Sequence, residues 1–169
     1  LVALEQDDSV EGLLVILNTA GGDVEAGLAI AEMIAGMSKP TVSLVLGGGH
    51  SIGVPLAVSA DYSFIAKSAA MTLHPLRMNG MVIGVMQTFD YFNKIQDRIV
   101  SFISDHSNIS KEDFNRLMLK TGEIANDVGS IVFGEAAVEC GLIDSVGSLR
   151  DALGKLKELI AAQKVQEEG

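Results

Sequence analysis

The sequence predicts an α/β fold in which short buried strands alternate with helices. The segments 13–17 and 41–46 are continuous apolar runs, as is typical of strands that are buried on both faces. A glycine-containing segment and then a helical pattern follow each run. The 18 glycines among 169 residues exceed the ordinary usage of about 7%. This composition suits an α/β fold with many tight turns.

The first quarter of the chain predicts one strand–helix–strand unit. We expect residues 1–4 to form a short helix or a strand end, followed by an acidic loop. A strand at 13–17 then leads through a glycine turn into a helix at about 24–36. Pro40 stops this helix, because a residue before proline is pushed out of the helical region, and a strand at 41–46 follows. The simplest arrangement is a right-handed crossover between parallel strands.

The middle of the chain centres on the glycine-rich segment 47–53, which reads GGGHSIG. We predict a turn here, followed by a helix at about 52–60 with Pro55 in its first turn, where a missing N–H does little harm. Two short strands are expected next, at 62–65 and 71–73.

The second half of the chain is mainly helical. Apolar residues recur at three- and four-residue steps over 85–106 and predict a long amphipathic helix. Ser110 has the character of an N-cap. The remaining expected elements are a helix at 111–120, a β-like run at 131–133, a helix at 134–140 that Gly141 ends, and a last helix at about 148–163.

Composition excludes several classes of partner and site. The net charge of −10 argues against a nucleic-acid partner and against a basic membrane-binding face. No apolar stretch reaches about 18 residues, so we expect no stable membrane insertion. The single cysteine, Cys140, excludes an intramolecular disulfide and does not indicate a zinc site. We expect no metal, no cofactor and a cytoplasmic location.

Acyl transfer needs a nucleophile, a base and donors for an oxyanion. Ser51, between the glycines and a helix, is the candidate nucleophile, although this stretch alone more often indicates a serine that is only an N-cap. His74 follows a short strand, where parallel α/β proteins place site residues, so it is the favoured base, and a structural histidine is the alternative. His50 adjoins the serine and should point elsewhere, and His106 lies at a helix end. The glycine pairs at 21–22 and 48–49 could supply N–H donors.

Four segments together resemble the Clp protease proteolytic subunit family, in the family's order and at similar spacings. They are 18–24 (NTAGGDV), 49–53 (GHSIG), 72–75 (TLHP) and 134–144 (GEAAVECGLID). Among the family's branches, the chain looks most like the translocation-enhancing protein group. The resemblance covers about residues 13–146.

The resemblance implies a Clp/crotonase-type ββα superhelix with a protruding long-helix handle at 85–106. It implies a serine endopeptidase in which Ser51 is the nucleophile and His74 is the general base. The backbone N–H groups of Gly22 and Ile52 would form the oxyanion hole. Asp127 is the acid nearest to the family's third triad position. Peptide or unfolded protein would be the substrate, and the subunits would form a homo-oligomeric ring, with stacked rings and an unfoldase as further expected partners.

The chain also departs from the family pattern. His50 stands where the family has alanine or a similar small residue, and residues 76–78 replace a glycine-rich stretch. The strand and helix expected before residue 13 are largely absent, so we expect residues 1–169 to be a single Clp-protease-like domain with a truncated N-terminal part. Two alternatives stay open, namely a catalytically inactive structural or adaptor ring and a crotonase-type enzyme acting on acyl-CoA.

Overall fold

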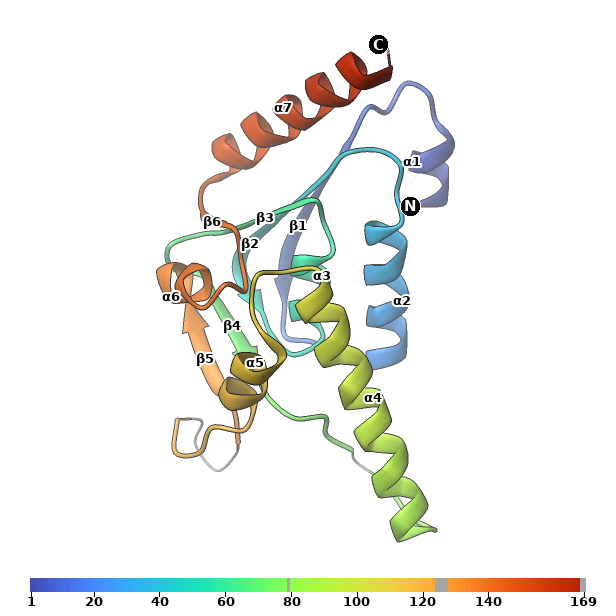
Figure 1. Ribbon diagram of the computed structural model, residues 1–169, viewed down its shortest axis with the longest axis vertical. Coiled ribbons are helices and arrows are strands. Elements are labelled where there is room, and N and C mark those ends of the chain that lie inside the picture. Colours follow the sequence, from blue (N-terminus) through green and yellow to red (C-terminus); the bar gives the residue numbers. More distant parts are fainter. Residues whose placement is uncertain (79, 124–127, 168–169) are drawn as a thin grey trace.

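A mostly parallel β-sheet crosses the molecule, with helices on both of its faces (Figure 1). The computed structural model describes residues 1–78, 80–123 and 128–167. The elements, in chain order, are α1 (Val2–Gln6), β1 (Leu13–Thr19), α2 (Val24–Ala35), β2 (Thr41–Gly49), α3 (Gly53–Val58), β3 (Tyr62–Ile65), β4 (Ala70–Leu73), α4 (Val85–Asp105), α5 (Lys111–Met118), β5 (Ser130–Phe133), α6 (Gly134–Glu139), β6 (Ser145–Val146) and α7 (Leu149–Glu167).

The strand β2 is the centre of the sheet. It pairs in parallel with β1 along one edge, and with β3 along the first half of the other edge. β3 in turn pairs in parallel with β6, while β4 pairs antiparallel with β5. The predicted parallel strand–helix–strand unit is therefore confirmed, and the carboxyl ends of β1 and β2 lie at the same edge of the sheet.

The two faces of β2 pack into two apolar clusters, since successive side chains of a strand point in opposite directions. Val42 and Leu44 pack with Ala152 and Leu156 of α7. Val45 belongs to the larger cluster, to which α2, α3, α4 and α5 contribute. Figure 1 shows α7 at one end of the molecule and the outer part of α4 extending from the other.

The glycines at 47–49 are part of β2, so the turn predicted over 47–53 is narrower than expected and lies at Ser51 and Ile52. A Cβ at Gly47 would lie 2.6 Å from Oδ1 of Asn18, and the same Oδ1 accepts a 3.0 Å hydrogen bond from the N–H of Gly48. The glycines therefore let the end of β2 lie close against β1. As a result, α3 begins at Gly53, one residue later than predicted, and ends at Val58.

Asp144 fastens β3 to the segment that leads into β6. Its carboxylate accepts hydrogen bonds from the N–H of Ser63 at 2.8 Å and from the hydroxyl of Ser63 at 2.7 Å. The N–H of Asp144 donates back to Oγ of Ser63 at 3.0 Å. Ser63 is buried, so these groups would lose both water and partner if the aspartate were removed. This supports a structural role for Asp144.

We predict that Asp144→Ala lowers the free energy of unfolding by about 1–3 kcal/mol, the cost of leaving buried polar groups unsatisfied. Asp97→Ala is the matched control, because Asp97 is exposed on α4, and its effect should stay within about 0.5 kcal/mol. Urea denaturation of both variants measures the difference. Equal stability of the two variants would contradict a structural role for the hydrogen bonds between Asp144 and Ser63.

Candidate active site

Ser51 occupies a sharp elbow between β2 and α3. Its φ of 57° lies in the left-handed region, and no other non-glycine residue in the described part of the chain has a positive φ. The backbone on either side closes the elbow, because the N–H of Gly53 donates to the carbonyl of His50 at 2.9 Å. The serine itself, rather than a glycine, makes the bend. Such an elbow projects a side chain away from the sheet edge.

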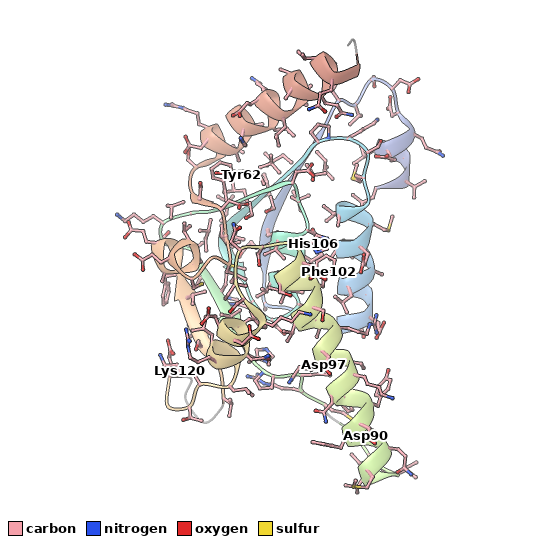
Figure 2. The ribbon with its side chains drawn as sticks, viewed as in Figure 1. Tyr62, Asp90, Asp97, Phe102, His106 and Lys120 are labelled. Atoms are coloured by element: carbon pink, nitrogen blue, oxygen red, sulfur yellow. The ribbon has the colours of Figure 1, made fainter. Side chains whose placement is uncertain are left out.

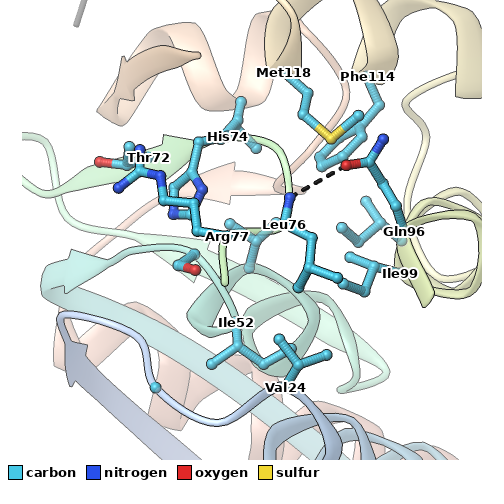
Figure 3. Close-up of a pocket in the computed structure, with 15 residues that line it drawn as sticks. Val24, Ile52, Thr72, His74, Leu76, Arg77, Gln96, Ile99, Phe114 and Met118 are labelled. Atoms are coloured by element: carbon cyan, nitrogen blue, oxygen red, sulfur yellow. Dashed lines mark hydrogen bonds between the residues drawn. The ribbon is translucent and has the colours of Figure 1, made fainter. Parts of the chain in front are cut away.

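A pocket of about 140 Å³ lies beside the elbow (Figure 3). Ser51, His74, Gly22 and Ile52 all line it, so the structure brings four of the five predicted site residues together. The fifth, Asp127, lies outside the described residues. The rest of the pocket is largely apolar, with walls formed by Val24, Val54, Leu73, Leu76, Ile99, Ile103, Phe114 and Met118.

His74 is held by its own neighbour at the end of β4. Its Nδ1 lies 2.7 Å from the carbonyl oxygen of Pro75. A carbonyl oxygen only accepts, so Nδ1 carries the proton in this contact, and Nε2 of a neutral ring keeps its lone pair. That is the tautomer a general base requires. Among the described residues, no hydrogen bond joins His74 to Ser51, and catalytic hydrogen bonds are often loose without substrate.

Two backbone N–H groups are available as oxyanion donors. Neither the N–H of Gly22 nor that of Ile52 donates to another described residue. The neighbouring Gly21 has φ 100°, and a Cβ there would lie 2.8 Å from Cβ of Ser51. The β1–α2 loop therefore packs directly on the elbow, which brings the Gly22 N–H to the same pocket as Ser51.

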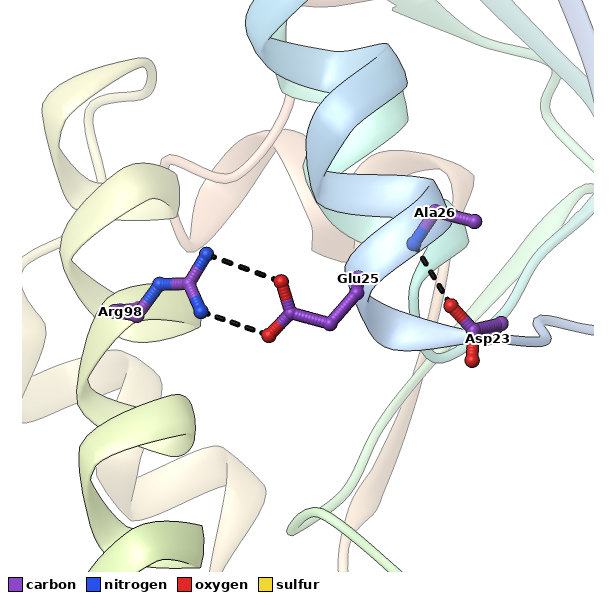
Figure 4. Close-up of polar contacts among 4 residues, drawn as sticks. All are labelled: Asp23, Glu25, Ala26 and Arg98. Atoms are coloured by element: carbon purple, nitrogen blue, oxygen red, sulfur yellow. Dashed lines mark hydrogen bonds and ion pairs between the residues drawn. The ribbon is translucent and has the colours of Figure 1, made fainter.

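The loop that carries Gly22 is anchored on its far side (Figure 4). Asp23 caps α2 by accepting a 2.8 Å hydrogen bond from the N–H of Ala26. The next acidic residue, Glu25, pairs with the guanidinium of Arg98 on α4 at 2.8 and 3.4 Å. Both side chains are largely exposed, so the pair contributes on the order of 0–1 kcal/mol. Its geometric effect is to link the start of α2 to α4.

Two polar residues at the site were not predicted from the sequence. Oε1 of Gln96 accepts a 3.2 Å hydrogen bond from the N–H of Leu76 (Figure 3). Thr72 bonds to the residue before the nucleophile, with its Oγ1 2.8 Å from Nδ1 of His50. Thr72 lies on β4, two residues before His74, and the sequence signals that could have indicated it are this spacing and its place in the segment 72–75.

The other two histidines do not line the described pocket. The ring of His50 lies over Gly48, where a Cβ would be 2.6 Å from its Nε2. His106 stacks on Phe102 at the end of α4, with ring centroids 4.1 Å apart (Figure 2), and its Nδ1 lies 2.8 Å from the carbonyl of Phe102. Cys140 also lies outside the pocket, and burial raises the pKa of its thiol.

Over residues 1–78, 80–123 and 128–167, no group of three or more metal-ligating side chains is arranged to hold a metal ion. In the same part of the chain, every helix is too short or too polar to cross a bilayer.

The two glycines before α2 give a matched test of the elbow packing. We predict that Gly21→Ala lowers the free energy of unfolding by about 1–2 kcal/mol or more, because a left-handed alanine is strained and its Cβ meets Ser51. Gly22→Ala should change it by less than about 0.5 kcal/mol, since no atom of the described residues lies within 4 Å of a Cβ there. Thermal denaturation measures both. A larger loss at Gly22 than at Gly21 would contradict this packing.

The sequence is similar to a known protein family and to several of its members. The family model described as Clp protease matches residues 1–150. The translocation-enhancing protein TepA of Halalkalibacterium halodurans is 62% identical over 97% of this chain and 64% of its own length. The ATP-dependent Clp protease proteolytic subunit of Leuconostoc citreum is 28% identical over 69% of this chain and 61% of its own. A subunit of the same description, numbered 1, from Chlamydia trachomatis is 24% identical over 85% of this chain and 73% of its own.

The chain thus spans less than two thirds of the length of the first two of these relatives. The matched region nevertheless includes the elbow, the strand that ends at His74 and the loop that carries Gly22. The chain belongs to the Clp protease family, and within that family it resembles the TepA-like branch.

Proposed function

We propose that this chain is the peptidase part of a serine endopeptidase subunit. The observation that carries the proposal is the left-handed elbow at Ser51, which shares one pocket with His74 and with the N–H groups of Gly22 and Ile52. A nucleophile, a base with its proton on Nδ1, and two N–H donors that bind no other described residue are the parts that acyl transfer requires.

In the proposed reaction, Nε2 of His74 takes the proton of Ser51 Oγ as the oxygen attacks the peptide carbonyl. The N–H groups of Gly22 and Ile52 hold the oxyanion of the tetrahedral intermediate. His74 then gives the proton to the leaving amine, and the C–N bond breaks to leave an acyl ester on Ser51. Water hydrolyses this ester by the same route and regenerates the serine.

We propose Asp127 as the residue that orients His74 in the reacting state. Such a carboxylate holds the imidazole tautomer and stabilises the imidazolium that forms. The carbonyl of Pro75 holds Nδ1 in the present arrangement, so Asp127 would have to replace or share this contact. The departure from Pro75 would let the ring turn its Nε2 towards Ser51.

We further propose that this subunit, as one Clp-protease-like domain with a ββα superhelix, assembles into cytoplasmic rings that take peptide or unfolded protein, with an unfoldase as a further partner. The outer end of α4, together with the segment 81–84 that leads into it, supports self-assembly. Ile83 is 92% exposed and Phe89 is 63% exposed, with other exposed apolar side chains around them, namely Met81, Val82, Val85 and Met86. An exposed apolar patch of this kind marks an interaction site, and a second copy is the proposed partner.

A catalytically inactive Clp-like ring is the second candidate. It is favoured by the orientation of His74, whose described hydrogen bond goes to Pro75 rather than to Ser51. It is also favoured by the name of the TepA relative, which describes translocation rather than proteolysis. The crotonase-type acyl-CoA enzyme stays an untested alternative.

Labelling with a fluorophosphonate probe separates the first two candidates. We predict that the full-length protein reacts, that Ser51→Ala abolishes labelling, and that His74→Gln slows it by about 10²-fold or more, the usual contribution of a general base. His106→Gln is the matched control and should label at the wild-type rate, because His106 lies outside the pocket. Labelling that survives in Ser51→Ala would refute the assignment, and a wild type that never reacts would favour the inactive ring.

Sedimentation velocity tests the assembly. We predict that the double change Ile83→Asp with Phe89→Asp reduces the mass of the assembled full-length protein, because charge cannot be buried in an apolar contact. Asp90→Asn, at an exposed position on the same helix (Figure 2), should leave the mass unchanged. An unaltered mass in the double variant would show that this end of α4 is not a subunit contact.

A further inference from the structure

His50 and Thr72 form a polar contact directly beside the nucleophile. Nδ1 of His50 lies 2.8 Å from Oγ1 of Thr72. The backbone makes a second link between the same two segments, because the N–H of Ser51 donates to the carbonyl of Thr72 at 2.9 Å. Thr72 thus contacts the elbow twice, once through its side chain and once through its backbone. We call this pair of hydrogen bonds the elbow clamp.

The elbow clamp joins the strand that carries the base to the strand that carries the nucleophile. Thr72 stands on β4, and His74 follows two residues later, just after the strand ends. Residues two apart in an extended segment point to the same face. In the described part of the sheet, β2 and β4 pair at a single position, Gly48 with Ala70. The backbone pairing between these two strands is therefore short, and the elbow clamp adds two polar contacts that hold β4 beside Ser51.

A histidine suits this position for reasons of shape. Its ring lies over Gly48, where a Cβ would be 2.6 Å from Nε2, so the missing side chain at Gly48 makes room for it. The backbone N–H of His50 donates to the carbonyl of Thr19 at 3.1 Å, at the end of β1. His50 thereby connects β1, whose loop carries Gly22, with β4, whose end carries His74. Alanine at this position has no side-chain group that could reach Thr72.

We propose that His50 is a positioning residue that acts through Thr72 to set the separation between Ser51 and His74. This inference rests on the proposed function. His50 does not touch the pocket in the described structure, so its effect on the reaction is geometric. Reacting groups must lie within about 3–3.5 Å, and a misplacement of about 1 Å can cost about 10²-fold in rate.

Matched substitutions on both partners test the elbow clamp through the rate of fluorophosphonate labelling of the full-length protein. Thr72→Val keeps the shape and removes the hydroxyl, whereas Thr72→Ser keeps the hydroxyl. His50→Ala removes the ring, whereas His50→Asn places an amide where Nδ1 lies. We expect Thr72→Val and His50→Ala each to slow labelling about tenfold or more, well within the range that misplacement can cause. The serine and asparagine variants should stay within about threefold of wild type.

The double variant, His50→Ala with Thr72→Val, should be no slower than the slower single variant, because both changes break one contact. The proposal would be overturned if the two single losses in labelling rate multiplied in the double variant. It would also be overturned if Thr72→Ser and His50→Asn both labelled as slowly as Thr72→Val and His50→Ala, or if all rates stayed within threefold of wild type. If His50 were the base itself, His50→Asn would lose labelling as completely as His74→Gln while Thr72→Val would not, and this result would also overturn the proposal.

A nuclear magnetic resonance measurement keeps the test separate from the proposed function. The ¹⁵N shifts of the His50 ring should change in Thr72→Val and not in Thr72→Ser, because only the first removes the partner of Nδ1. If the wild type is not labelled, the proposed function fails and the positioning role fails with it. The ring shifts still report whether Nδ1 of His50 contacts the Thr72 hydroxyl. Unchanged shifts in Thr72→Val would refute this side-chain bond of the elbow clamp.

Discussion

The left-handed backbone at Ser51 is the constraint on which the site depends. A non-glycine residue in this region costs about 1–2 kcal/mol, so the surrounding structure has to hold it there. Three segments do so. Gly21 packs against Ser51 from the β1–α2 loop. The N–H of Ser51 donates a hydrogen bond to the carbonyl of Thr72 on β4, and α3 starts two residues after Ser51. The same three contacts bring the oxyanion donors and the base to the serine.

The order and type of most elements could be predicted from sequence, because apolar runs and helical periodicity report burial directly. The boundaries at 47–53 could not. Three consecutive glycines indicate a turn when only local preference is considered. In the fold they continue β2, where Asn18 of the neighbouring strand occupies the space that a side chain at Gly47 would need and accepts a hydrogen bond from the N–H of Gly48. The tertiary contact overrides the local preference, and the bend moves to Ser51.

Some residues of the candidate site could likewise be predicted from the sequence, and others could not. Ser51, His74, Gly22 and Ile52 were predicted from strand ends and from the family resemblance, and all of them line the pocket. Thr72 and His50 were not assigned a role, because their contact joins residues that are far apart in sequence and depends on the missing side chain at Gly48. Asp127 stays a prediction, since it lies outside the described residues.

The helix α4 connects the site to the proposed assembly. Its inner half supplies Gln96, Ile99 and Ile103 to the pocket, and its outer half carries the exposed Phe89, with the exposed Ile83 in the segment just before it. A helix is stiff along its axis, so a contact that moves the outer end also moves the pocket wall. Gln96 holds the N–H of Leu76, two residues beyond His74. In the proposed reaction His74 turns from the Pro75 carbonyl towards Ser51. The segment that follows it is hydrogen-bonded to α4, the helix that would contact a neighbouring subunit. Assembly through this end of the molecule would therefore couple mechanically to the orientation of His74.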